Sequence, residues 1–119
     1  MKLSVIVPTH NRMAWLEQLL NSLETQTYSD FEVIVAIDGS TDGTLAMLEA
    51  VKRRSQIRLE LLVLPQGGQA KARNAAIQAA SGQVLVFADD DLTFAPDVLA
   101  RHAAFHQVFQ NSIAIGAVQ

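Results

Sequence analysis

Short apolar runs of strand length alternate along this chain with segments whose apolar residues recur at helical spacing. The strand-like runs cover residues 3–7, 31–37, 57–64, 83–88 and 113–118, and the helical patterns cover residues 15–23, 45–51, 69–80 and 96–109. This alternation predicts right-handed β-α-β crossovers and a mainly parallel sheet. We expect helices on both faces of the sheet, in three α/β/α layers, with the wholly apolar run at residues 84–87 in its middle.

Composition narrows the class of protein further. The chain has 119 residues, half of them hydrophobic, which predicts one domain over residues 1–119 with a real core. Nine Lys and Arg are spread among twelve acidic residues, so we expect no nucleic-acid partner. The chain has no cysteine, its apolar runs are too short to span a membrane, and no signal-peptide pattern opens it. We therefore expect a cytoplasmic protein.

Three adjacent carboxylates, Asp89, Asp90 and Asp91, follow the apolar run at residues 84–88. Carboxylates this close repel one another by about 1 to 2 kcal/mol per pair, and a divalent cation would reverse that cost. Oxygen ligands without Cys or clustered His favour Mg²⁺ or Mn²⁺. If the run stays extended, Asp89 and Asp91 point to one side and Asp90 to the other, so that metal binding and a sugar or base hydroxyl are separated. A solvated acidic turn is the alternative.

Other polar residues also follow predicted strands, and in open parallel sheets ligands bind at the carboxyl ends of the strands. Asp38 ends the second run and could accept a hydrogen bond from a base N–H, or cap the following turn. His10 lies in the first such loop, where it could stack on a base or simply occupy the loop. The glycines of residues 67–68 open a helix that could bind a phosphate, with Arg73 favoured over Lys71 to face it.

Taken in order, four blocks closely resemble the nucleotide-sugar half of family 2 glycosyltransferases, which have a Rossmann-like GT-A fold. The blocks are LSVIVPTHNR, VIVAIDGSTDGT, GGQAKARNAAI and GQVLVFADDDLTFAPDVL, and the likeness spans nearly the whole chain. The resemblance implies that the chain binds a nucleotide-sugar donor, commonly a UDP-sugar, with a divalent cation that bridges the diphosphate and the aspartates.

The resemblance also implies a role for individual residues. Pro8 and His10 would flank the base, and Asp38 would bind the uracil edge. Arg73 would reach the base or the diphosphate. Asp89 or Asp90 would hold the ribose, with Asp91 as the principal metal ligand and Asp89 beside it. His10 stands where the family often has Tyr, and Ile37 where it often has a further Asp, which leaves the donor open.

The resemblance accounts for binding of the donor, which is only one half of a transfer reaction. Family members are mostly inverting and use a carboxylate base from an acceptor-binding half, which would follow Gln119, so we assign no catalytic base. The domain is then expected to be incomplete at its C-terminus, and its uncovered apolar surface could lead to homo-oligomers. The acceptor is unknown.

Two other functions stay open beside glycosyl transfer. The chain could bind a nucleotide sugar without transferring it, as a module or a subunit of a larger enzyme. It could instead be a phosphoacceptor signalling domain, which also places acids and Mg²⁺ at the carboxyl end of a parallel sheet. Against that function, no acidic pair follows the first strand, and no Lys occurs after Gly82.

Overall fold

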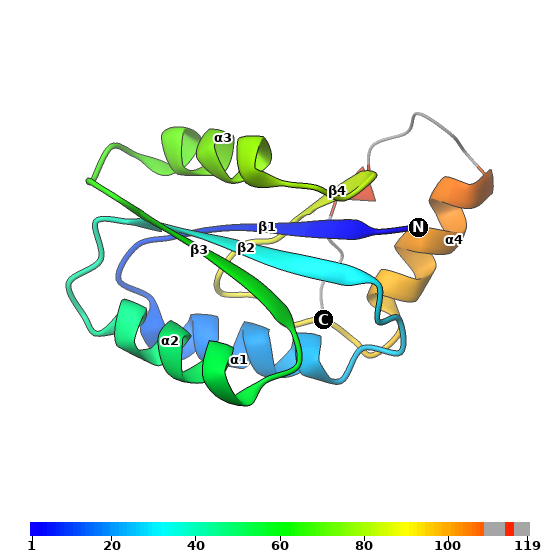
Figure 1. Ribbon diagram of the computed structural model, residues 1–119, viewed down its shortest axis with the longest axis horizontal. Helices are drawn as coiled ribbons and strands as arrows, with labels where there is room; N and C mark the ends of the chain where they lie inside the picture. The colour runs from blue at the N-terminus through cyan, green and yellow to red at the C-terminus, as the bar shows by residue number, and fades with distance from the viewer. Residues whose placement is uncertain (109–113, 116–119) are drawn as a thin grey trace.

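The computed structural model describes residues 1–108 and 114–115, and its elements alternate as the sequence predicts (Figure 1). In chain order they are β1 (Leu3–Thr9), α1 (Met13–Glu24), β2 (Phe31–Asp38), α2 (Thr44–Arg54), β3 (Arg58–Leu64), α3 (Gln69–Ala79), β4 (Val84–Phe87), α4 (Val98–Val108) and β5 (Ala114–Ile115). Most of the fifth predicted strand, residues 113 and 116–118, lies outside the described residues. No helix in the described part of the chain is long and apolar enough to cross a membrane.

All pairings in the sheet are parallel, and the strand order is β3-β2-β1-β4-β5. The chain therefore adds β2 and β3 on one side of β1 and β4 and β5 on the other, so the order reverses between β1 and β4. In an open parallel sheet, a ligand crevice forms at such a switch point, outside the carboxyl ends of the two strands.

Helices cover both faces of the sheet, which confirms the three-layer α/β/α arrangement (Figure 1). The larger core lies between the sheet and α1, α2 and α4, where four leucines of α1 are almost completely buried: Leu16, Leu19, Leu20 and Leu23. Trp15, which has the same helical spacing, is instead 53% exposed. On the other face, α3 packs closely through Ala72 and Ala76, since small side chains let a helix approach a sheet.

Two details of the strands differ from the prediction. The wholly apolar strand β4 is an interior strand, paired with β1 and β5, but β1 is the central strand and three of the four residues of β4 are only half-buried. Strand β1 does not end with the apolar run at residue 7 but continues through Pro8 to Thr9. Ile6 accepts a hydrogen bond from Ala88 on the β4 side, and Pro8, two residues later, faces the same way. Because β4 has already ended there, the missing N–H of proline leaves no bond unmade.

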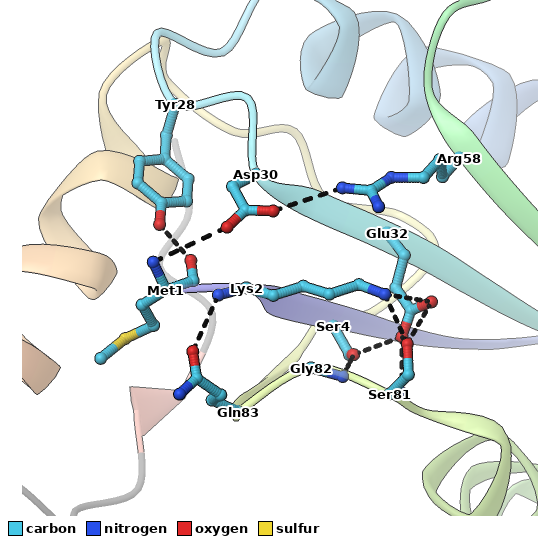
Figure 2. Close-up of polar contacts among 10 residues, drawn as sticks. All are labelled: Met1, Lys2, Ser4, Tyr28, Asp30, Glu32, Arg58, Ser81, Gly82 and Gln83. Atoms are coloured by element: carbon cyan, nitrogen blue, oxygen red, sulfur yellow. Dashed lines mark hydrogen bonds and ion pairs between the residues drawn. The ribbon is translucent and has the colours of Figure 1, made fainter.

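A polar cluster formed by Lys2, Ser4, Glu32, Ser81 and Gly82 joins β1 and β2 to the turn before β4, at the amino end of the strands (Figure 2). The buried Ser4 hydroxyl donates to Glu32 Oε2 at 2.6 Å and accepts from Gly82 N at 2.8 Å. Glu32 also accepts from Ser81 N at 2.7 Å and lies 3.6 Å from Lys2 Nζ. Burial raises the pKa of Glu32, but the hydrogen bonds from Ser4 and Ser81 and the charge of Lys2 outweigh it and leave this pKa lowered.

Candidate functional site

A cleft of about 510 Å³ opens at the carboxyl ends of β1, β2 and β4, where the strand order reverses. Its lining residues are Pro8, Thr9, His10, Arg12, Asp38, Gln69, Asp89, Asp90 and Asp91. Six of the seven predicted site residues are therefore together in one cleft, although they come from three separate strand ends. Arg73 is the exception.

The loop after β1 is fixed to the loop after β2 by Asn11. Asn11 has a φ of +52°, which asparagine tolerates better than most residues, and its side-chain oxygen accepts a hydrogen bond from Thr41 N at 2.7 Å. Its backbone N–H donates to Ser40 Oγ at 3.0 Å. In the same loop, His10 Nδ1 lies 2.5 Å from the backbone oxygen of Asp38, which fixes the imidazole at the cleft wall.

Asp38 is only 7% exposed, and its carboxylate binds the segment that leads into α3. Its two oxygens accept hydrogen bonds from Gly67 N at 2.8 Å and Gly68 N at 3.2 Å. This carboxylate faces the glycine turn for which the sequence predicted a phosphate. The structure thus shows Asp38 bonded to the turn before α3 instead of the turn that directly follows it, and both the phosphate at this turn and the base contact of Asp38 stay predictions.

The acidic segment after β4 is a turn, so the condition under which the carboxylates would alternate, an extended run, is not met. Leu92 N donates to Asp89 O at 3.3 Å, which closes the turn. Asp90 and Asp91 both approach Arg12, at 3.8 and 3.7 Å, and do not point to opposite sides. Thr9 Oγ1 donates to the second oxygen of Asp90 at 2.8 Å, whereas Asp89 is exposed.

Burial and the surrounding groups shift the pKa of Asp90. Burial raises its pKa, and the neighbouring carboxylates of Asp91 and Asp89 raise it further, while the Thr9 hydroxyl and Arg12 act in the opposite direction. The net effect is a raised pKa, so Thr9 and Arg12 only partly balance the negative charge here.

The carboxylate oxygens of these aspartates are the kind of ligand that a hard divalent cation prefers. Within residues 1–108, no group of three or more His, Asp or Glu side chains converges as a complete metal site. Mg²⁺ and Mn²⁺, however, are often bound by one or two carboxylates and completed by substrate phosphates. Asp91 is 46% exposed and Asp89 is also exposed, so both carboxylates are available for such shared binding.

The α3 helix contributes Gln69, and not Arg73, to the cleft lining. Gln69 is the first residue of α3, so its side chain begins at the carboxyl end of the sheet. Arg73 comes one helical turn later on the same face, further from that end, and is half-buried. Arg73 is thus not among the residues that line the cleft, and its contact with the donor stays a prediction.

Sequence reasoning also missed Thr9, Arg12 and Gln69. A signal for the first two was present, because Thr9 lies between Pro8 and His10, which were already chosen, and Arg12 follows two residues after His10. The pairing of a hydroxyl and a guanidinium with the distant aspartates depends on β1 and β4 being neighbours, which the order of elements along the chain does not reveal.

Residues 4–119 match the model of the family described as "Glycosyl transferase family 2". The chain belongs to this family. Among curated relatives, the poly(ribitol-phosphate) beta-N-acetylglucosaminyltransferase TarS of Staphylococcus aureus is 39% identical over 107 residues, which cover 88% of this chain and 19% of TarS. Across the curated relatives compared, the chain spans between 13% and 36% of their length.

Solved structures of glycosyltransferases share the fold, which is the GT-A fold. S. aureus TarS 1–349, in complex with UDP-GlcNAc, has a TM-score of 0.79 at 38% identity, covering 91% of this chain and 32% of that one. The mannosyltransferase PcManGT from Pyrobaculum calidifontis, in complex with GDP-Man and Mn²⁺, has a TM-score of 0.78 at 31% identity, covering 87% of this chain and 32% of that one.

Proposed function

We propose that this chain is the donor-binding part of a glycosyltransferase that transfers a sugar from a nucleotide sugar, a UDP-sugar by preference, to an acceptor. The observation that supports this most is the cleft at the switch point, where six predicted donor-binding residues meet in a chain of family 2. The relative crystallised with UDP-GlcNAc supports the class of donor. Transfer with inversion would need a carboxylate base from outside the residues assigned here.

The charge of the cleft argues for a divalent cation. Four carboxylates line it against one arginine, so a nucleoside diphosphate entering alone would meet like charge. We assign the cation to Asp91 and Asp89, whose exposed oxygens suit Mg²⁺ or Mn²⁺. When bound, the cation would neutralise charge on the departing nucleoside diphosphate. The complex of PcManGT with Mn²⁺ supports this choice.

Other residues of the cleft lining would bind the base and the ribose of the donor. Pro8 and the fixed imidazole of His10 would hold the base between them. Asp38 would accept the uracil N–H, since a carboxylate has room for about four hydrogen bonds and the two glycine N–H groups use only part of that capacity. Asp90, close to the Thr9 hydroxyl, would bind the ribose. For Arg73, a contact with the base or diphosphate requires a change at the start of α3.

Calorimetric titration of UDP tests this function, once with Mn²⁺ and once with EDTA. We expect binding with Mn²⁺ and much weaker binding with EDTA, and an equal absence of binding in both would overturn the proposal. Incubation with UDP-sugars labelled in the sugar then separates transfer from mere binding. Release of the labelled sugar supports a transferase, whereas tight binding of an intact donor supports a nucleotide-sugar-binding module.

A further inference from the structure

Arg12 lies beside the acidic turn in the lining of the cleft. It is the only Lys or Arg side chain among the described residues that line this cleft, and it lies within 4 Å of two carboxylates. Its Nε is 3.8 Å from Asp90 Oδ1, and its Nη1 is 3.7 Å from Asp91 Oδ2. One guanidinium thus balances part of the charge of two aspartates.

The backbone of Arg12 is fixed, but its charged end is held loosely. Its carbonyl oxygen accepts from Leu16 N at 2.9 Å at the start of α1, and Asn11 before it is tied to the loop after β2. The side chain, in contrast, is 50% exposed, and both of its ion-pair distances are near the upper limit for such contacts. By comparison, Arg101 on α4 forms a closer ion pair, with its Nε 2.8 Å from Asp97 Oδ2.

We propose that Arg12 is an exchangeable counterion: it balances Asp90 and Asp91 when no divalent cation is bound, and it binds the donor diphosphate once the cation has taken its place. This inference rests on the proposed function. A guanidinium and a divalent cation compete for the same carboxylate oxygens, and a released guanidinium has a planar set of N–H donors suited to phosphate oxygens. The half-exposed side chain can turn from one to the other without moving its fixed backbone.

The exchange predicts effects of opposite sign in one variant, Arg12→Gln. Without nucleotide, loss of the competing cation should strengthen Mn²⁺ binding by roughly two- to five-fold, the size expected for a half-exposed ion pair. At saturating Mn²⁺, UDP binding should weaken by about ten-fold or more, because charge-assisted bonds to the diphosphate are lost. Uridine, which has no phosphate, should bind the variant and the wild type equally. Arg12→Lys keeps the charge and should fall between them.

Mn²⁺ binding can be followed by the electron paramagnetic resonance signal of the free ion, and UDP and uridine binding by calorimetry. Arg101→Gln is the matched control, because it removes an arginine paired with an aspartate far from the cleft, and it should change none of these affinities. Circular dichroism of each variant checks that it is folded.

The outcomes separate this inference from the proposed function. If wild-type chain fails to bind UDP with Mn²⁺, the proposed function fails. Suppose instead that the wild type binds UDP. If Arg12→Gln then binds Mn²⁺ and UDP as tightly as the wild type, or binds Mn²⁺ more weakly than the wild type, the exchange is overturned and the proposed function stands. Stronger Mn²⁺ binding together with weaker UDP binding supports the exchange.

Discussion

Replacing Ser4 with alanine removes the hydroxyl at the centre of the polar cluster that joins β1, β2 and the turn before β4 (Figure 2). The hydroxyl is completely buried and makes two hydrogen bonds, one to the Glu32 carboxylate and one from the backbone N–H of Gly82. The substitution leaves both partners in place without this contact. We expect it to destabilise the fold without reaching the cleft, which lies at the opposite ends of the strands.

The magnitude follows from the two bonds. A bond to a charged group is worth about 1.5 to 3 kcal/mol and a neutral one about 1 kcal/mol, so about 4 kcal/mol is the ceiling. Glu32 is 13% exposed and Gly82 is only half-buried, so water can partly replace the hydroxyl, and we expect about 2 kcal/mol. With an unfolding entropy of about 250 cal/mol/K for 119 residues, that loss lowers the melting temperature by about 8 °C.

Thermal unfolding at pH 7, followed by circular dichroism, measures this shift. Ser29→Ala is the control, because Ser29 is an exposed serine for which the structure gives no side-chain hydrogen bond, and its melting temperature should change by less than about 2 °C. The affinity for UDP and Mn²⁺, measured well below the melting temperature, should be the same in both variants. A Ser4→Ala protein as stable as the control would refute the reasoning.

Three further predictions concern charge, backbone and metal. The pKa of Glu32 is lowered below its ordinary value of 4.5, so ionised Glu32 stabilises the fold above that pH, and the effect is lost as pH falls through the folded pKa. The melting temperature of Glu32→Gln should therefore lie below that of the wild type at pH 7 and approach it near pH 3. Gly39→Ala should lower the free energy of unfolding in urea by about 2 to 4 kcal/mol, because the φ of Gly39 is +65° and an added Cβ would lie 2.7 Å from the Cβ of Gln66. The control Gly67→Ala should lower it less, because there the added Cβ closely meets only the Lys71 side chain. Asp91→Asn should weaken Mn²⁺-dependent UDP binding by about ten-fold or more with little change in melting temperature, and the control Asp97→Asn, on the Arg101 pair, should leave UDP binding unchanged.

Local signals in the sequence were enough to predict the elements and the side of the sheet that holds the site. Apolar, β-branched runs define β1 and β2, which are almost completely buried, and polar residues directly after them mark the carboxyl ends. Since all strands are parallel, those ends meet at one edge, and the cleft gathers six of the predicted residues there.

What the sequence did not reveal depends on which strands are neighbours and on the local backbone. The pairing of Thr9 and Arg12 with the aspartates needs β4 beside β1, and the path of β1 through Pro8 needs the early end of β4. The sequence left an extended run and a turn open for the acidic segment, and the hydrogen bond from Leu92 N to Asp89 O shows the turn. Arg73 was preferred to Lys71 as the residue of α3 that faces the site, but neither lines the cleft, which Gln69 at the start of α3 lines instead.

The central claim is that the aspartate turn and the surrounding cleft bind a cation-chelated nucleoside diphosphate. Diffraction data collected at the manganese edge, from crystals soaked in MnCl₂ and UDP, test this claim most directly. We expect an anomalous peak beside Asp91 and Asp89, with the diphosphate against it and the base between Pro8 and His10. A cleft that holds neither manganese nor UDP, or a nucleotide bound at another place on the molecule, would contradict the claim.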